Sequence, residues 1–414
     1  MSSQPGTQRA ANPWYAAGAI GLAAAFLLCG YEFVRSTSTN LFLEAYGKDR
    51  LPQVMALVPV GVVLALYAYG RLLSGLGPRR TLMATSLFSA LAIALCYVSI
   101  RLGSRPATGV LYIVREVYVV LLIEQYWSFL NSTLGLEQAK KLNGPICGLA
   151  SLGSVAGAAA VAAWSVPLGT ETMLVFAASL VLPAAFCSAW AYRSCGEPTR
   201  SASPAEPSAD NLALRHFRAS PTLFLLLLVI LATQALSTVL DLAFYAQLHE
   251  RYPDKDVRNA VSGEFWTVVN LASAAGQFVF TPLLMRWVPL RFLHAAIPIV
   301  NGLACGYFLH APSWYSAGFA YMLFKTLDYS LFRAAKETLY IPFSFDVRYR
   351  AKQVIDVFGY RFGKGGTALA ITLLKGAGWT LTLAMYGYVA LAATVLWLVL
   401  IVPTTKARPA PQDS

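Results

Sequence analysis

Long apolar runs separated by short polar breaks dominate this 414-residue chain. A run of about 20 residues is the length that an α-helix needs to cross roughly 30 Å of hydrocarbon. Because 57% of the residues are hydrophobic and only 13% are charged, a soluble fold is excluded. We predict an all-α polytopic membrane protein with twelve spans, at 16–36, 53–73, 81–101, 108–130, 144–165, 172–193, 221–246, 262–285, 289–310, 314–332, 353–375 and 379–402.

The longest polar break, residues 194–219, is rich in Ser, Pro and Ala and predicts a flexible cytoplasmic linker. It separates a six-helix bundle over 1–193 from a second over 220–403, which a cytoplasmic tail over 404–414 follows. Two six-helix halves around a midplane site are the arrangement of the major facilitator fold. Lysine and arginine are concentrated in the loops on the side of the termini. Both termini are therefore predicted in the cytoplasm, and the protein in the plasma (inner) membrane.

Composition also excludes several functions. Basic cytoplasmic loops account for the net charge of +12, so this charge does not indicate nucleic-acid binding. The six cysteines and four histidines show no spacing typical of a metal site, a catalytic triad or a phosphate loop. We predict no enzyme activity, no metal and no cofactor. The expected partners are the lipid bilayer and a small anionic solute, bound by a monomer.

Charged residues inside the first and fourth spans indicate a functional interior, because a charge at membrane depth is costly unless it pairs or faces water. Glu32 and Arg35 lie three residues apart and can pair. The polar residues 36–40 that follow favour a water-lined cavity over a frayed helix end. In the fourth span, both Glu116 and Glu124 can face the interior, where protonation would be available for coupling. The alternative is that a neighbouring arginine, Arg115, neutralises Glu116.

The seventh and eighth spans add further polar groups. Asp241 stands alone among apolar residues and needs a partner, for which Arg361 and Lys364 are the natural candidates. Trp266 and Asn270 lie four residues apart, which suits either stacking and hydrogen bonding to a ligand or helix-to-helix contact.

The tenth and eleventh spans are the most densely charged. Lys325 and Asp328 are three residues apart, with Tyr321 nearby. Helical spacing allows the polar residues of the eleventh span to address one cavity, and these are Asp356, Tyr360, Arg361 and Lys364.

Glycine has two expected roles. In the fifth span, Gly153 and Gly157 lie four residues apart and favour close packing against a neighbouring helix. In the eleventh span, glycines 359, 363, 365 and 366 predict irregular backbone beside the charges.

Two adjacent stretches, YSLFRAAKETLYIP (329–342) and RYRAKQVIDVFGYRFGKGG (348–366), resemble the signature of the ATP/ADP translocase family of plastids and obligate intracellular bacteria. The aspartate-proline usual after the phenylalanine is replaced by Arg333 and Ala334. The matching positions are Tyr329, Ser330, Phe332, Lys336, Glu337, Tyr340, Ile341, Pro342, Lys352, Asp356, Arg361, Gly363 and Lys364.

The resemblance implies alternating-access transport, with exchange of a nucleotide or another phosphorylated metabolite. Phosphate would be held by Arg35, Lys325, Arg361 and Lys364, and the rest of the substrate by Trp266, Asn270, Tyr321 and Tyr360. Coupling or gating would fall to Glu32, Arg115, Glu116, Glu124, Asp241, Asp328 and Asp356.

A count of five deep basic residues against six acidic ones leaves two possibilities open. Either the substrate is less anionic than ATP, or some carboxylates carry protons. Two other functions also remain: a proton-coupled symporter or exporter of a less charged or lipid-like solute, and a membrane sensor or scaffold without turnover.

Overall fold

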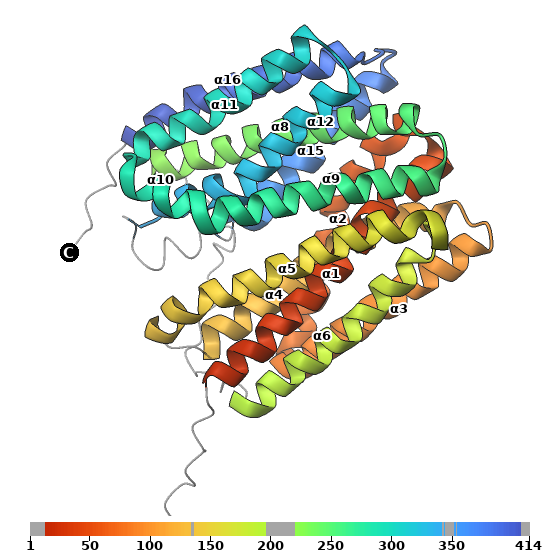
Figure 1. The fold of residues 1–414 in the computed structure, drawn as a ribbon, viewed down its shortest axis with the longest axis vertical. Coiled ribbons are helices and arrows are strands. Elements are labelled where there is room, and N and C mark those ends of the chain that lie inside the picture. Colours follow the sequence, from red (N-terminus) through yellow and green to blue (C-terminus); the bar gives the residue numbers. More distant parts are fainter. Residues whose placement is uncertain are drawn as a thin grey trace, which may run out of the picture. The chain divides into compact units, whose positions relative to one another are not determined.

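The computed structural model describes residues 13–133, 136–195, 220–341, 343, 352 and 354–406, and the regular elements among them are all helical (Figure 1). This confirms the all-α fold class. The α-helices are α1 (Pro13–Tyr46), α2 (Leu51–Leu76), α3 (Pro78–Arg101), α4 (Pro106–Thr133), α5 (Leu136–Leu168), α6 (Met173–Cys195), α8 (Pro221–Arg251), α9 (Lys255–Ala275), α10 (Thr281–Trp287), α11 (Leu290–His310), α12 (Trp314–Leu327), α13 (Arg333–Thr338), α15 (Tyr360–Gly376) and α16 (Leu383–Lys406).

Several of these helices are joined into longer runs by π-helical turns, which hold one residue more per hydrogen-bonded ring than an α-helix. The turn η2 (Gly276–Phe280) joins α9 to α10, and η3 (Asp328–Phe332) joins α12 to α13. A third turn, η4 (Val354–Gly359), leads into α15. A short 3₁₀ turn, η1 (Lys48–Arg50), precedes α2. With continuous runs counted once, the described residues form 12 helices, as predicted.

Nine helices among the described residues are long and apolar enough to cross a membrane. The other three runs are α4, α12–α13 and η4–α15. These three carry Arg115, Lys325 and Arg361 among other charged residues, and charge lowers mean hydropathy. The runs that fall short on hydropathy are therefore those in which function was predicted.

Several predicted helix ends are wrong, and two of them lie at polar sequence inside a buried helix. The first span was expected to end at residue 36, but α1 continues to Tyr46 and buries residues 36–40 inside the helix. The tenth span was expected to end at 332, but α13 continues to Thr338 and buries Lys336. Polar side chains ended neither helix, because tertiary partners satisfy them.

The chain divides into two compact units. Unit 1 comprises Met1–Leu41, Gly61–Ser201 and Asn259–Thr267, and unit 2 comprises Phe42–Val60, Ala202–Arg258 and Val268–Ser414. The end of α1, the start of α2 and the first part of α9 thus change units along single helices. Residues 196–219 of the predicted linker lie outside the described residues.

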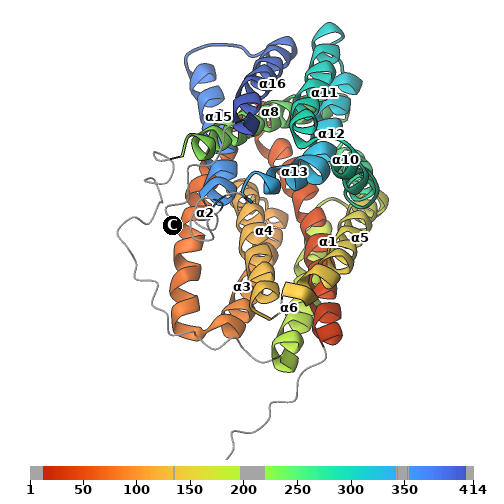
Figure 2. The ribbon, with the colours of Figure 1, turned by 90° about the vertical axis from the view of Figure 1, so that its left-hand side faces the viewer.

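Unit 1 is built around α1 and α3. Helix α3 packs against both α4 and α6 (Figure 2). The shared core includes Phe33, Ile93, Leu111 and Leu174, which come from four different helices. Burial of this apolar surface stabilises the unit and fixes how α1 and α4 present their polar residues.

Glycines bring α5 close to α1, as predicted. A Cβ atom added at Gly153 would lie 2.1 Å from the Ala25 carbonyl oxygen, and one at Gly157 would lie 2.5 Å from that of Cys29. Both distances are shorter than van der Waals contact, so only glycine permits this backbone approach.

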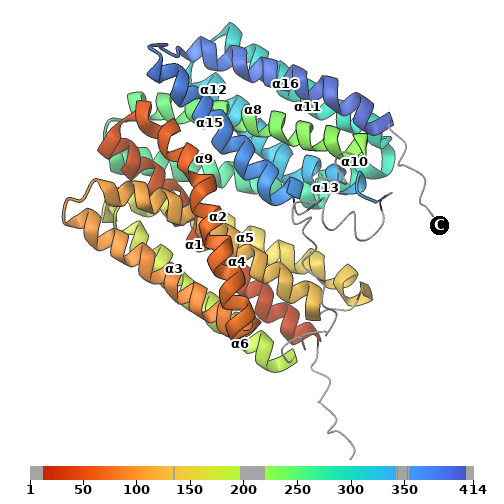
Figure 3. The ribbon, with the colours of Figure 1, turned by 180° about the vertical axis from the view of Figure 1, so that it is seen from behind.

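Unit 2 is organised around α8, which packs against α12, α15 and α16, while α11 packs against α12 and α16 (Figures 1 and 3). Most of α8 is buried, from Leu223 to Leu248. A charge on this helix is therefore surrounded by other helices, which places Asp241 in the interior of the unit.

Candidate functional site

The first site is a buried hydrogen-bonded network in unit 1. Arg35 pairs with Glu32 one helical turn away, as predicted. The Arg115 guanidinium lies 2.9 Å from a Glu116 carboxylate oxygen and donates hydrogen bonds to the Thr39 hydroxyl at 2.7 Å and to the Arg35 carbonyl at 3.1 Å. We call these five residues, with Ser38, the N-terminal polar cluster. Of the two alternatives for Glu116, the structure favours neutralisation by Arg115.

Aromatic rings cover both guanidinium groups of this cluster. The Arg35 Cζ atom lies 3.4 Å from the centre of the Trp266 ring, and the Arg115 Cζ atom lies 3.9 Å from that of Tyr112. Cation–π contact at such distances is favourable in a dry interior. Trp266 was predicted to stack on a ligand, but here its ring stacks on Arg35.

The polar end of α1 is tied to α9 and α5 through one asparagine that the sequence did not single out. The Asn259 side chain accepts a hydrogen bond from Asn40 at 3.0 Å and donates to the hydroxyls of Thr37 at 3.3 Å and Ser165 at 2.9 Å. Asn259 was missed because it precedes the predicted eighth span. A lone polar residue at a helix start has no pattern that distinguishes it from a loop residue.

The second site is in unit 2, where α8 meets α12 and α15. Lys364 Nζ lies 3.0 Å from Asp241 Oδ2, so the buried aspartate has one of its two expected partners. Lys325 Nζ donates to the Ser237 hydroxyl at 2.9 Å. Since Ser237 and Asp241 are one turn apart on α8, this helix receives both lysines on one face.

More charged and aromatic groups of the same helices complete this site. Lys336 is buried, and its Nζ atom lies 5.0 Å from the centre of the Tyr360 ring. Asp328 is also buried, whereas Arg361 is half-buried. The term C-terminal polar cluster is used below for Ser237, Asp241, Lys325, Asp328, Lys336, Tyr360, Arg361 and Lys364.

Two residues predicted to contact the substrate, Tyr321 and Asn270, are buried. Tyr321 is only 2% exposed and packs 5.6 Å from the Phe244 ring. Asn270 is buried as well and belongs to unit 2, whereas Trp266 belongs to unit 1. Trp266 and Asn270 lie one turn apart on α9, and the ring of Trp266 stacks on Arg35.

The remaining predicted residues are placed as follows. The side chains of Glu124 and Asp356, and the whole of Pro342, lie outside the described residues. Tyr340 is buried. Lys352 Nζ lies 2.7 Å from the Glu337 carboxylate, and both side chains are more than 40% exposed. Lys352 and Glu337, which both match the family signature, thus form an exposed ion pair and are not buried charges.

The irregular backbone predicted beside the charges lies one turn earlier than expected. The turn η4 ends at Gly359, and α15 is regular from Tyr360 onward. Gly363 and Gly365 instead allow close packing, since a Cβ atom on them would lie 2.9 Å from Gln234 and 2.3 Å from Pro59. π-helical turns are frequent at functional sites.

Glu264 on α9 was also missed. Its side chain is exposed although α9 belongs to a candidate span, Lys255–Trp287. The available signal was a carboxylate two residues before Trp266 inside the predicted eighth span. A carboxylate in such a segment either faces water or binds a proton.

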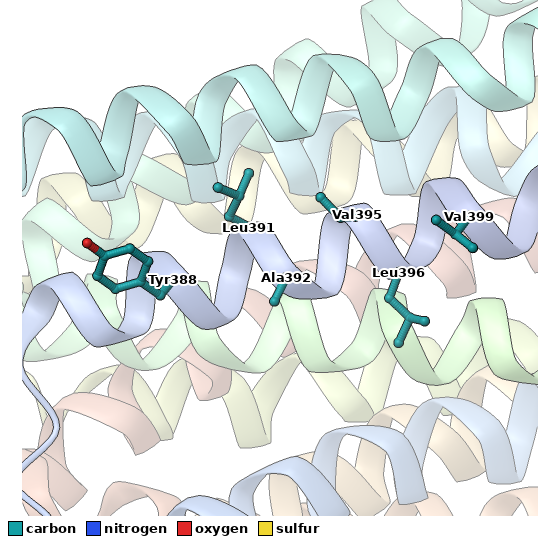
Figure 4. Close-up of a pocket in the computed structure, with 6 residues that line it drawn as sticks. All are labelled: Tyr388, Leu391, Ala392, Val395, Leu396 and Val399. Carbon is teal, nitrogen blue, oxygen red and sulfur yellow. The ribbon is translucent and has the colours of Figure 1, made fainter.

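A hollow of about 500 Å³ lies along α16 and is lined by apolar side chains with one tyrosine (Figure 4). Its residues follow one face of the helix, as at a lipid-facing surface. They are Tyr388, Leu391, Ala392, Val395, Leu396 and Val399. No charged group is among them, so this hollow does not suit an anion.

Curated relatives and a family model match the chain. Residues 316–407 match the model of the TLC ATP/ADP transporter family. The chain is 25% identical over 334 residues to ADP,ATP carrier protein 1 of Chlamydia muridarum (strain MoPn / Nigg), with 69% of this chain and 62% of the carrier covered. It is 24% identical over 297 residues to ADP,ATP carrier protein 2, chloroplastic, of Arabidopsis thaliana, with 62% and 47% covered. The chain thus spans less than two thirds of these relatives' length.

Solved structures show the fold. A point mutant of the nucleoside transporter NupG superposes with a TM-score of 0.70 at 11% identity, covering 94% of this chain and 99% of that one. A bacterial homologue of the iron transporter ferroportin, in its inward-facing state, gives 0.72 at 14% identity, covering 96% and 100%. These likenesses confirm the major-facilitator-type fold. The chain is thus an integral multi-pass membrane protein of this fold, and its C-terminal part, residues 316–407, is similar to the TLC ATP/ADP transporter family.

Proposed function

We propose that the protein is a transporter that works by alternating access and exchanges a phosphorylated metabolite, such as a nucleotide, across the membrane. The observation that carries this proposal is the C-terminal polar cluster, where four basic side chains, all at least partly buried, lie on helices of the region that matches the family model. Ionisable groups at such depth usually mark a substrate path. Lysine and arginine are the residues that proteins use to hold phosphate.

In this proposal the phosphate contacts come from Lys325, Arg361 and Lys364, with Lys336 added by the structure. Tyr360, half-buried beside Lys336, offers a ring to the rest of the substrate. Asp241 and Asp328 lower the net positive charge of the cluster. The N-terminal polar cluster takes a gating role, because its arginines are already paired with carboxylates.

Counterflow in proteoliposomes tests the proposal. Purified protein is reconstituted with an internal pool of unlabelled AMP, ADP, ATP or glucose 6-phosphate, and entry of the same labelled compound is followed. We expect accumulation of at least one compound that depends on the internal pool. Absence of counterflow above protein-free vesicles for every compound would contradict the proposal.

Proton coupling is a second candidate, and Glu264 favours it because an exposed carboxylate on a membrane helix can exchange protons with water. If coupling occurs, an imposed inward pH gradient drives uptake into vesicles without internal substrate. Glu264→Gln then abolishes the effect of the gradient, while Glu264→Asp retains part of it. An exchange rate that does not change with the imposed pH gradient would contradict proton coupling.

We also propose that the chain lies in the plasma membrane as a monomer with both termini in the cytoplasm. The orientation of the termini is supported by the excess of lysine and arginine in the loops on their side of the membrane.

A further inference from the structure

The turn between α10 and α11 places two arginines beside exposed aromatic rings, outside both polar clusters. We propose that this turn, residues 286–292, binds the headgroup of an anionic phospholipid such as phosphatidylglycerol. These residues are called the α10–α11 tip below. The proposal concerns the bilayer around the protein and does not depend on which solute is transported.

The tip lies at the boundary of the hydrocarbon layer. One candidate span, Lys255–Trp287, ends there, and the next, Leu290–His310, begins there. Only Val288 and Pro289 separate the two spans, and two extended residues reach about 7 Å at most. The headgroup layer is roughly 5–7 Å thick on each side of the bilayer. A connection this short therefore holds the tip among the headgroups.

Both arginines of the tip lie next to an exposed ring. The Arg286 Cζ atom lies 5.4 Å from the centre of the Trp287 ring, and the Arg291 Cζ atom lies 4.8 Å from that of Phe292. Trp287 is 74% exposed and Phe292 is 56% exposed. Tryptophan is enriched at headgroup level, and an arginine there lays its apolar stem along hydrocarbon while its charged end reaches water. The tip thus offers rings to acyl chains and guanidinium groups to phosphate.

The tip is positively charged, and its neighbours in the sequence do not offset this charge. Arg286 and Arg291 are exposed, and the chain contains no aspartate or glutamate from residue 265 to residue 327. A guanidinium group donates paired hydrogen bonds to phosphate oxygens. Near an anionic membrane surface, each basic residue strengthens binding about fivefold. A free phosphate ion would meet the same two charges, but the exposed rings favour a ligand that carries acyl chains.

Lipid association at the tip can be measured locally on the full-length protein. A fluorophore is attached to Val288→Cys in a variant without the natural cysteines, and the protein is reconstituted with brominated phosphatidylglycerol or brominated phosphatidylcholine. Bromine quenches fluorescence only at short range, so the quenching gives the ratio of the two association constants at the tip. We expect phosphatidylglycerol to be preferred by about fivefold or more. The preference should fall as salt is raised, because ions screen exposed charges.

Substitution of both arginines tests their part in this preference. Arg286→Gln combined with Arg291→Gln should bring the ratio to about one, because it removes both charges and leaves the rings in place. Arg50→Gln combined with Arg251→Gln is the matched control. These two arginines are also exposed, but each directly follows an acidic residue in the sequence. The control should keep the ratio of the unmodified tip.

Three results would overturn the proposal. The first is a ratio near one with the unmodified tip, and the second is a preference that neither salt nor the double substitution reduces. The third is loss of the preference in inorganic phosphate when sodium chloride of equal ionic strength preserves it, since a free anion would then be the ligand. If the double variant does not fold, the ratio with the unmodified tip and its salt dependence still decide.

Discussion

Lys364 and Asp241 show what a charge requires in the interior of this protein. Asp241 lies on the central helix α8 among apolar side chains, and Lys364 is 3.0 Å from its carboxylate. The aspartate side chain is 8% exposed, while that of the lysine is 23% exposed. Losing the lysine would therefore strand a buried charge, whereas losing the aspartate would leave a cation that water can reach.

Lys364→Met should accordingly destabilise the protein by about 3 kcal/mol, in the range for breaking a buried pair. Thermal unfolding of the purified protein in detergent measures the effect. Lys375→Met on the same helix is the matched control, because the partner of Lys375, Asp49, is 78% exposed. Exposed pairs contribute less than about 1 kcal/mol. Equal effects of the two substitutions would show that the Lys364 pair is not structurally special.

Some contacts between single side chains could be predicted from the sequence. The Glu32–Arg35 pair follows from a separation of three residues on one helix. The Lys364–Asp241 pair followed from the rule that a lone buried aspartate needs a cation, although Arg361 was an equal candidate. Sequence spacing could not predict the stacking of Trp266 on Arg35 or the hydrogen bond between Asn259 and Asn40. Both contacts depend on the packing of α9 against α1, which brings together residues far apart in the sequence.

At the scale of helices, α5 and α1 depend on two glycines for their separation. Gly153→Ala should push the helices apart, because the added methyl group would meet the Ala25 backbone at 2.1 Å. Overpacking of this kind typically costs about 1–3 kcal/mol. We expect a lower melting temperature and less folded protein on size-exclusion chromatography.

Gly144→Ala on the same helix has no atom within 4 Å of the added Cβ. It should be neutral or slightly stabilising, since alanine favours helix. Comparing the two variants separates the effect of the contact between Gly153 and Ala25 from the effect of helix propensity. A similar loss of thermal stability in both variants would argue against close packing at Gly153.

Helix α9 begins with a defined cap. The Asp254 carboxylate accepts hydrogen bonds from the backbone N–H groups of Asp256 and Val257 at 2.8 and 2.9 Å. These bonds lower the pKa of Asp254 below its usual value of 3.8. The stabilisation is thus fully present above that value and is lost as the pH falls through the lowered pKa.

Asp254→Ala should lower the melting temperature at neutral pH, because it removes the cap. Asp254→Ser keeps an accepting oxygen and should retain most of the stability. If the two variants melted together, the cap would contribute nothing measurable to this helix.

Helix number and order could be predicted from the lengths of the apolar runs and the polar breaks between them, because the bilayer fixes the length of each run. Helix ends could not. The polar residues 36–40 look like a terminus in sequence, but inside α1 Asn259 bonds Thr37 and Asn40, and Arg115 bonds Ser38 and Thr39. A π-helical turn likewise has no hydropathy signal, so the extension of α12 into α13 was missed.

On the scale of the whole molecule, ion pairs link the connection between α1 and α2 to helices from later in the chain. Arg258, fully buried at the start of α9, lies 2.7 Å from the Glu44 carboxylate. Lys48 pairs with Glu250, and Asp49 lies 2.8 Å from Lys375. All six residues belong to unit 2, so these pairs hold the end of α1 and the start of α2 against the other helices of that unit.

Glu44→Gln weakens the tie to Arg258 while leaving that arginine its bonds to the Tyr252 and Pro253 carbonyl oxygens. It should loosen the start of α9 and with it the hydrogen bond from Asn259 to Thr37. Labelling of Thr37→Cys by a water-soluble maleimide, in a background without the natural cysteines, should become several-fold faster. Glu337→Gln, which breaks the exposed pair with Lys352, is the control and should leave the labelling rate unchanged.

The predicted orientation is tested with reporters at both ends. Green fluorescent protein fused to either terminus should fluoresce, and alkaline phosphatase fused there should be inactive, because both termini are proposed to be cytoplasmic. Active phosphatase at either end would reverse or break the twelve-span arrangement.

The π-helical turn η4 stands immediately before Tyr360, Arg361 and Lys364. Because such a turn holds one residue more than a regular α-helical turn, deleting a single residue between 354 and 359 would convert it to α-helix and leave the residues after it facing nearly the same way. The same deletion between Tyr360 and Lys364, in regular α15, would rotate Lys364 by about 100°, away from Asp241. Related chains can therefore differ in length by one residue at this turn and still aim these cations alike, whereas an alignment that places the gap inside α15 would match letters whose side chains face different directions.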